Sequence, residues 1–133
     1  MICLGILLML LTITAGGCKV EEKNDAKVSD MEFTVISEKE IPEELKKIID
    51  EKKGQEMKLT YMSDDKLYII RGYGMQKTGG YSIQVKDLYQ AKNAVYFKSE
   101  LIGPGENDVS EKVESYPYIV VSTKKTEDVV VFE

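Results

Sequence analysis

The stretch from Gly72 to Lys86 reads GYGMQKTGGYSIQVK and contains the most informative local pattern of the chain. Its second half alternates apolar and polar residues, with Tyr81, Ile83 and Val85 on one side. That period of two is typical of a β-strand with one buried face. The preceding Gly79-Gly80 pair suits a bend or bulge, where glycine tolerates positive φ. The stretch therefore predicts two strands joined by a glycine-rich connection.

Two phosphate-binding patterns can be excluded for these glycines. Gly74 and Gly79 have the spacing of a phosphate loop, but Gly80 and Tyr81 follow in place of the required Lys and Ser or Thr. A dinucleotide fingerprint fails as well, because Lys77 stands where its third glycine should be. The segment also joins two strands, so it offers no helix N-terminus to an anion. A strand connection is the interpretation that remains.

Further strand-like segments lie on both sides of this stretch. The segments before and after the polar residues 63–65 predict a hairpin, and the last two segments predict a second hairpin that closes the domain. β-branched and aromatic residues dominate these segments. In chain order the expected strands are Glu32–Ile36, Met57–Met62, Lys66–Tyr73, Tyr81–Lys86, Val95–Leu101, Tyr118–Ser122 and Val129–Phe132.

One helix is expected, from about Pro42 to Lys53. Its apolar residues Ile41, Leu45, Ile48 and Ile49 fall on one face of a 3.6-residue period. That face must cover a sheet, which indicates the α+β class: an antiparallel sheet of about six or seven strands with one amphipathic helix packed on it. The alternative is an all-β sandwich in which the helix is a minor insertion.

The N-terminal residues resemble an export signal. The first 17 residues carry no charge and contain an apolar run of the length of a signal-peptide core, followed by Thr14-Ala15-Gly16-Gly17-Cys18. This resembles a lipobox, so we expect a signal peptide over 1–17, a lipid on Cys18, a flexible charged tether over 18–31 and one domain over 32–133. The alternative is a buried N-terminal element of the domain. The expected location is the extracytoplasmic face of a bacterial membrane.

The composition excludes several classes of function. The chain has no histidine, and its two cysteines, Cys3 and Cys18, both lie in the export region. Imidazole and thiolate catalysis and the usual zinc sites are therefore absent from the expected domain. The net charge of −5 argues against nucleic acid as a partner.

The carboxylates remain as the only material for a catalytic pair or a calcium site. They fall in apparent turns or strand ends, where water keeps both members of a pair ionised. We therefore expect no enzymatic activity, no cofactor and no metal. The residues concerned are Asp64, Asp65, Asp87, Glu106, Asn107 and Asp108.

The glycine-rich stretch and the segments after it resemble a known protein family. A glycine, a basic residue and Thr78-Gly79-Gly80-Tyr81 before an alternating strand are similar to the signature of the PrcB C-terminal domain. The later Gly103-Pro104-Gly105 and the Pro-aromatic strand from Pro117 to Val121 agree with it. The resemblance extends over roughly Lys66 to Phe132. PrcB is an accessory subunit of a secreted protease complex, and the signature contains no known catalytic group.

The resemblance implies a lipid-anchored accessory protein that binds or stabilises a protein partner, for which a secreted or envelope protease is the expected candidate. An inhibitor is a variant of the same hypothesis. The expected contact residues are Thr78, Gly79, Gly80, Tyr81, Tyr116, Pro117 and Tyr118. A simpler alternative makes Tyr81 and Tyr118 half-buried sheet residues.

The residue types also allow a second class of function. The protein would then bind a small molecule or cell wall through an aromatic cleft. The tyrosines available for such a cleft are Tyr61, Tyr68, Tyr73, Tyr81, Tyr89, Tyr96, Tyr116 and Tyr118.

Overall fold

The computed structural model of the chain describes residues 27–106 and 112–133. These residues form eight strands in two four-stranded sheets, with one α-helix and a short 3-10 helix. The signal segment, Cys18 and most of the expected tether lie outside the described residues. In chain order the elements are β1 (Ser29–Asp30), β2 (Phe33–Val35), η2 (Glu38–Glu40), α2 (Glu43–Lys52), β3 (Glu56–Met62), β4 (Lys66–Tyr73), β5 (Ser82–Gln90), β6 (Ala94–Ile102), β7 (Tyr118–Lys124) and β8 (Val129–Phe132).

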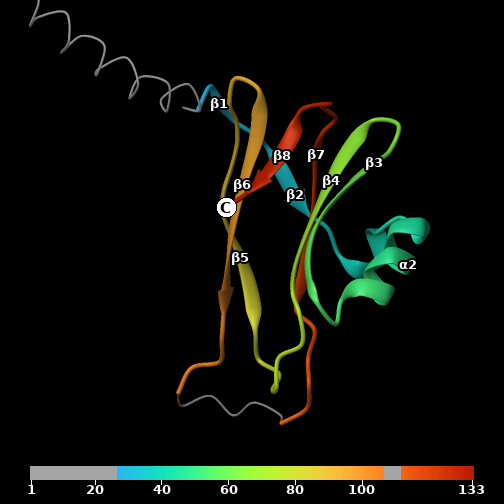
Figure 1. Cartoon of the computed structure of the whole chain (residues 1–133), viewed down its shortest axis with the longest axis vertical. Helices are drawn as coiled ribbons and strands as arrows, with labels where there is room; N and C mark the ends of the chain where they lie inside the picture. Colours follow the sequence, from blue (N-terminus) through green and yellow to red (C-terminus); the bar gives the residue numbers. More distant parts are fainter. Residues whose placement is uncertain (1–26, 107–111) are drawn as a thin grey trace, which may run out of the picture.

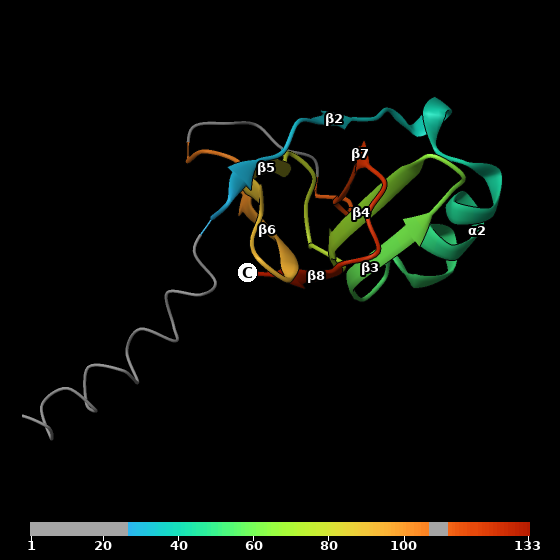
Figure 2. The same ribbon diagram turned by 90° about the horizontal axis from the view of Figure 1, so that it is seen from above.

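The molecule is built in three layers (Figure 1). One layer is the sheet β1-β5-β6-β8, called here the β5–β6 sheet, and the next is the sheet β2-β7-β4-β3, called the β4–β7 sheet. The helix α2 covers the side of the β4–β7 sheet that faces away from the other sheet. Figure 2 shows the same order from above.

The expected helix on a sheet is thus confirmed, and the α+β class holds in its broad form. The arrangement of the strands differs from the expectation of one sheet with six or seven members. Two sheets face each other, as in the sandwich alternative, and the short β1 was not expected from the sequence. Apolar alternation marks a strand but does not identify its neighbours, because sheet pairing is decided between distant segments.

The predicted hairpin of β3 and β4 is confirmed, whereas the predicted closing hairpin is wrong. β3 and β4 pair antiparallel from Glu56 opposite Tyr73 to Met62 opposite Leu67. β7, however, pairs with β2 and β4, and β8 crosses to the other sheet and runs parallel to β6. The four residues 125–128 between β7 and β8 therefore change layers instead of forming a hairpin turn.

Two apolar clusters hold the layers together. The cluster between the sheets is formed by the buried side chains of Leu67, Ile69, Leu88, Val95, Phe97, Ile119 and Val121. The cluster between the β4–β7 sheet and the helix is formed by the buried side chains of Ile41, Leu45, Ile49, Met57, Ile70 and Val120. β4 and β7 contribute to both clusters, which explains their nearly continuous apolar sequences.

The helix fits its sequence pattern closely. It begins after Pro42, which is the N-cap residue, and Glu43 and Glu44 lie in its first turn, where negative charge is favourable. Leu45 and Ile49 are buried against the sheet, so the predicted stripe is the face that packs. Within the described part of the chain, no helix combines the length and apolarity needed to cross a membrane.

The replacement Ile49→Ala tests this packing. Ile49 is 0% exposed, and truncating a fully buried Ile costs about 2–5 kcal/mol because it removes apolar contacts and leaves a cavity. We expect a correspondingly lower free energy of unfolding in urea. The control Lys47→Ala, at an exposed position of the same helix, should change it by about 0.5 kcal/mol or less. Equal effects of the two variants would contradict the packing described here.

Candidate functional site

The glycine-rich connection between β4 and β5 lies at one end of the sandwich, next to the segment that precedes β7. Gln76 and Ser115 form an antiparallel bridge, with backbone N–O distances of 2.8 Å and 3.0 Å in the two directions. The Ser115 hydroxyl also donates a hydrogen bond to the Thr78 carbonyl oxygen at 2.7 Å. The two sequence segments predicted as contact residues, 78–81 and 116–118, are therefore brought side by side.

The glycines of this connection have different roles. Among the described residues, positive φ occurs at Gly74, with 76°, and at Gly80, with 85°. A Cβ added to Gly79 would meet nothing within 4 Å. The left-handed turn that the sequence suggested for the pair therefore falls on Gly80, and Gly79 is required neither by conformation nor by crowding.

The three tyrosines of the predicted site lie in different surroundings. Tyr81 lies over Gly103, where a Cβ built on the glycine would be 3.2 Å from the ring. Tyr116 is 37% exposed, and the Lys53 ammonium lies 5.9 Å from its ring centroid. Tyr118 packs against the helix-side cluster, where burial, followed by the Glu38 charge, raises the pKa of its hydroxyl. Tyr116 is thus the most accessible of the three.

Exposed apolar side chains accompany Tyr116 at this end of the sandwich. Met75 is 44% exposed, Ile102 is 41% and Val113 is 62%. They come from three segments that the Gln76–Ser115 bridge and the Tyr81–Gly103 contact hold together. We call Met75, Ile102, Val113 and Tyr116 the contact end. Exposed apolar side chains gathered on a surface mark interaction sites more often than single ones do.

A buried charge lies beside the contact end and was not singled out from the sequence. Arg71 is 8% exposed on β4, and its Nη2 donates a hydrogen bond to Glu56 Oε2 at 3.0 Å. Its Nη1 donates to the Gly72 carbonyl oxygen at 2.6 Å, and its guanidinium carbon lies 4.1 Å from the Tyr73 ring centroid. A lone Arg within an apolar strand is the sequence signal that could have revealed it.

This polar cluster also connects the two sheets. The Tyr73 hydroxyl on β4 is hydrogen-bonded to the Ser99 hydroxyl on β6. Near the contact end, these polar contacts thus add to the apolar packing between the sheets, to which Ile83 and Ile119 still contribute. Because planar guanidinium stacking and ion pairing both need a fixed geometry, the cluster holds the ends of β4 and β6 in place.

The tyrosines do not gather into one aromatic cleft in the described part of the chain. Tyr61 and Tyr68 form a tilted pair on the helix side of the β4–β7 sheet, with ring centroids 6.1 Å apart. Tyr89 and Tyr96 are stacked with centroids 5.2 Å apart, on neighbouring strands of the other sheet. These pairs are cross-strand contacts that stabilise their own sheets.

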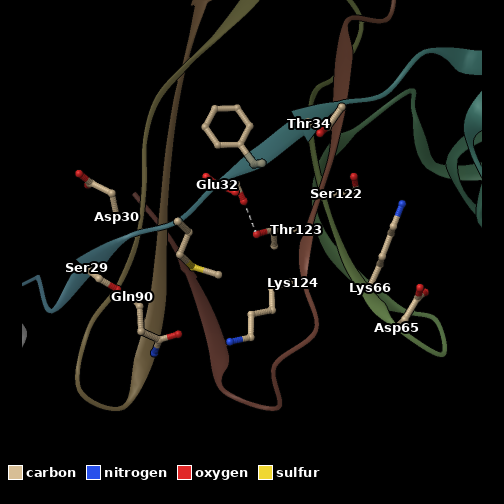
Figure 3. Close-up of a pocket in the computed structure, with 12 residues that line it drawn as sticks. Ser29, Asp30, Glu32, Thr34, Asp65, Lys66, Gln90, Ser122, Thr123 and Lys124 are labelled. Carbon is tan, nitrogen blue, oxygen red and sulfur yellow. Dashed lines mark hydrogen bonds between the residues drawn. The ribbon is translucent and has the colours of Figure 1, made fainter.

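A groove of about 970 Å³ opens at the opposite end of the sandwich (Figure 3). It lies where the chain crosses from β1 to β2, and Thr123 donates a hydrogen bond to the Glu32 carbonyl oxygen at 2.7 Å inside it. Figure 3 shows Asp30 and Gln90 on one side and Asp65 and Lys66 on the other. Tyrosine is not among its lining residues, so it does not supply the stacking surface that the small-molecule hypothesis requires.

The residues considered for a catalytic pair or a calcium site are mostly exposed where the structure describes them. Asp64, Asp65 and Glu106 are exposed, Asp87 is half-buried on β5, and Asn107 and Asp108 lie outside the described residues. Within residues 27–106 and 112–133, no group of three or more Cys, Asp or Glu residues is arranged to hold a metal ion. The exposed positions of Asp64, Asp65 and Glu106 agree with the solvated turns expected from the sequence.

Residues 67–124 match the PrcB C-terminal family, which confirms the resemblance seen in the sequence. The matched range begins in β4 and ends with β7, so it contains the glycine connection, the β5–β6 hairpin and the segment before β7. The helix, β3 and β8 lie outside it. No curated protein and no solved structure matches the chain.

The two glycines of the signature make a matched pair of mutations. Gly80→Ala forces a side chain into positive φ, which costs about 1–2 kcal/mol and should lower the melting temperature by roughly 4–8 °C per kcal/mol in a domain of this size. Gly79→Ala meets open space and should leave the melting temperature nearly unchanged. Thermal unfolding followed by circular dichroism measures both. A larger loss for Gly79→Ala would contradict the turn geometry.

Proposed function

Because residues 67–124 match the PrcB C-terminal family, we propose that this protein is a non-catalytic accessory protein that binds or stabilises a protein partner. The expected partner is a secreted or envelope protease. The observation that carries the proposal is the contact end. There the segments of the family signature meet, and Met75, Ile102, Val113 and Tyr116 expose apolar surface to solvent.

The chemistry of the contact end suits a protein surface better than a small ligand. Its members project from loops and strand ends, and they line neither the groove of Figure 3 nor a smaller groove beside β8. Tyr and Met are enriched in protein interfaces, because they bury large areas and adapt to the opposing surface. The charged neighbours Lys53 and Lys77 would form the polar rim of such an interface.

The position of the chain entry supports an anchored arrangement. β1 pairs with the Gln90 end of β5, whereas the contact end lies beside the Ser82 end of the same strand. Nine residues of strand separate the two ends, a distance of about 30 Å. A lipid on Cys18, followed by the expected tether, would therefore attach the domain at the end of the sandwich opposite to the contact end.

The partner hypothesis can be tested in cells in which the protein is native. Tagged protein is crosslinked, affinity-purified and analysed by mass spectrometry, and we expect a secreted protease to be recovered in proportion to the tagged protein. The double variant Met75→Ser, Tyr116→Ser should reduce this recovery at least tenfold, because it removes central apolar area. Its melting temperature should stay close to that of the wild type, because both side chains are exposed.

A matched control alters exposed apolar side chains outside the contact end. Val28 is 67% exposed at the chain entry, and Val35 is 52% exposed on β2, opposite Val121 of β7. The double variant Val28→Ser, Val35→Ser should leave the recovery unchanged. Equal losses for both double variants would show that the contact end is not the binding surface, and recovery of no specific protein would overturn the accessory function.

The anchor has its own test. Cys18→Ala should move the protein from the detergent phase to the aqueous phase in a phase-partitioning experiment, because a diacylglycerol group would no longer be attached. Cys3→Ala is the matched control, since the expected signal peptide carries Cys3 away, and it should leave partitioning unchanged. Detergent-phase partitioning of the Cys18→Ala protein would refute the lipid anchor.

A further inference from the structure

Near the contact end, the β5–β6 sheet has only two strands in the described part of the chain. β6 extends from Ala94 to Ile102, but β8 pairs with it only from Ala94 to Phe97. On the other side, β1 pairs only with Tyr89 and Gln90 of β5. The segments 82–85 and 99–102 therefore form a two-stranded ribbon, visible in Figure 1 as the lower part of β5 and β6. Such ribbons are marginally stable in water by themselves.

The backbone groups along the open edge of β6 can be assigned from the neighbouring bonds. The Phe97 carbonyl oxygen accepts a hydrogen bond from the Glu133 N–H at 2.8 Å, so Phe97 directs its backbone groups away from β5. Directions alternate along a strand, and Ser99 and Leu101 consequently point the same way. Their N–H and C=O groups face the open edge, while those of Lys98 and Glu100 face β5.

The two open edges differ in their suitability for another strand. The β5 edge carries a register shift between Val85 and Asp87, with Lys86 as the extra residue. A bulge is a device that discourages pairing at an edge. The edge of β6 between Ser99 and Ile102 pairs in regular register with residues 82–85 of β5 and contains no proline. The β6 edge is thus the one open to addition.

The inner face of β3 lies uncovered beside this edge. Lys58 and Thr60 are paired with Arg71 and Ile69 of β4, and Ile69 belongs to the cluster between the sheets, so both side chains are on the inward face. Both are nevertheless exposed. They line a groove of about 430 Å³ together with Val130 and Phe132 of β8, which places β3 on the same side as the open edge of β6.

We propose that an extended segment of the partner protein adds to the β5–β6 sheet along residues 98–102 of β6. The inference rests on the proposed function and identifies how the partner is held. Its backbone bonds to Ser99 and Leu101, since unpaired peptide groups at an edge are satisfied best by another extended backbone. Its inward side chains are polar and lie near Lys58 and Glu56, and its outward side chains flank Lys98 and Glu100.

Amide hydrogen exchange on the purified complex tests this directly. Protein recovered with its partner is compared with the protein alone, using residue-resolved exchange. We expect the amides of Ser99 and Leu101 to exchange at least tenfold more slowly in the complex. The amides of Lys98 and Glu100 already bond within the hairpin and serve as internal controls, with little change between the two samples.

A pair of proline variants provides an independent test. Leu101→Pro removes an N–H that faces the open edge and leaves the β5–β6 ladder intact, because proline is tolerated where its nitrogen faces solvent. We expect at least a tenfold loss of partner recovery. Ile83→Pro is the matched control, since Ile83 lies opposite Leu101 and faces the other open edge; it should leave recovery unchanged.

The outcomes distinguish the strand addition from the proposed function. A stoichiometric complex in which the Ser99 and Leu101 amides stay unprotected overturns the strand addition and leaves the accessory function standing. Recovery of no partner overturns both. Protection of the same amides in the isolated protein, rising with its concentration and accompanied by dimers in sedimentation, would make a second copy the occupant and refute the assignment to a partner protein. If Leu101→Pro fails to fold, the exchange comparison decides alone.

Discussion

The burial of β4 and β7 on both faces is the constraint on which the rest of the structure depends. Ile69 and Val121 belong to the cluster between the sheets, while Ile70 and Val120 belong to the cluster beneath the helix. Successive side chains of a strand point to opposite faces, so each of these strands needs a covering layer on each side. One layer is the β5–β6 sheet and the other is α2. Removing either would expose a full row of apolar side chains.

The contacts between the two sheets change in character toward the contact end. In the middle of the sandwich, apolar side chains fill the space between the sheets. Toward the contact end, polar contacts join this packing, through the Tyr73–Ser99 hydrogen bond and the Arg71–Glu56 ion pair. Arg71 is buried but Glu56 is exposed, so their ion pair adds little net stability compared with apolar packing. Together with the Tyr73–Ser99 hydrogen bond, it positions the strand ends beside the loops of the contact end.

In the proposed function, stability and binding are therefore served by different parts of one small domain. The helix and the central strands carry the apolar packing, and the glycine connection with its neighbours carries exposed apolar side chains on a fixed frame. This division is common, because exposed residues can change without cost to the core while the core keeps their positions constant. A partner that adds a strand to β6 would also complete the sheet at its thinnest part.

The sequence by itself determined the local elements: the helix with its apolar stripe, the β3–β4 hairpin, the alternating strands and a glycine turn within the Gly79-Gly80 pair. Each depends on residues close together in the chain, through period, capping and backbone freedom. It also identified the two segments that meet at the contact end, by resemblance, without showing that they meet.

Only the tertiary structure decided that β7 and β8 belong to different sheets, that Tyr118 packs toward the helix, and that Arg71 is enclosed by Glu56 and Tyr73. These features arise between segments far apart in the chain. Their free energy depends on which surfaces come together, and hydrophobic periodicity specifies a buried face without specifying what buries it.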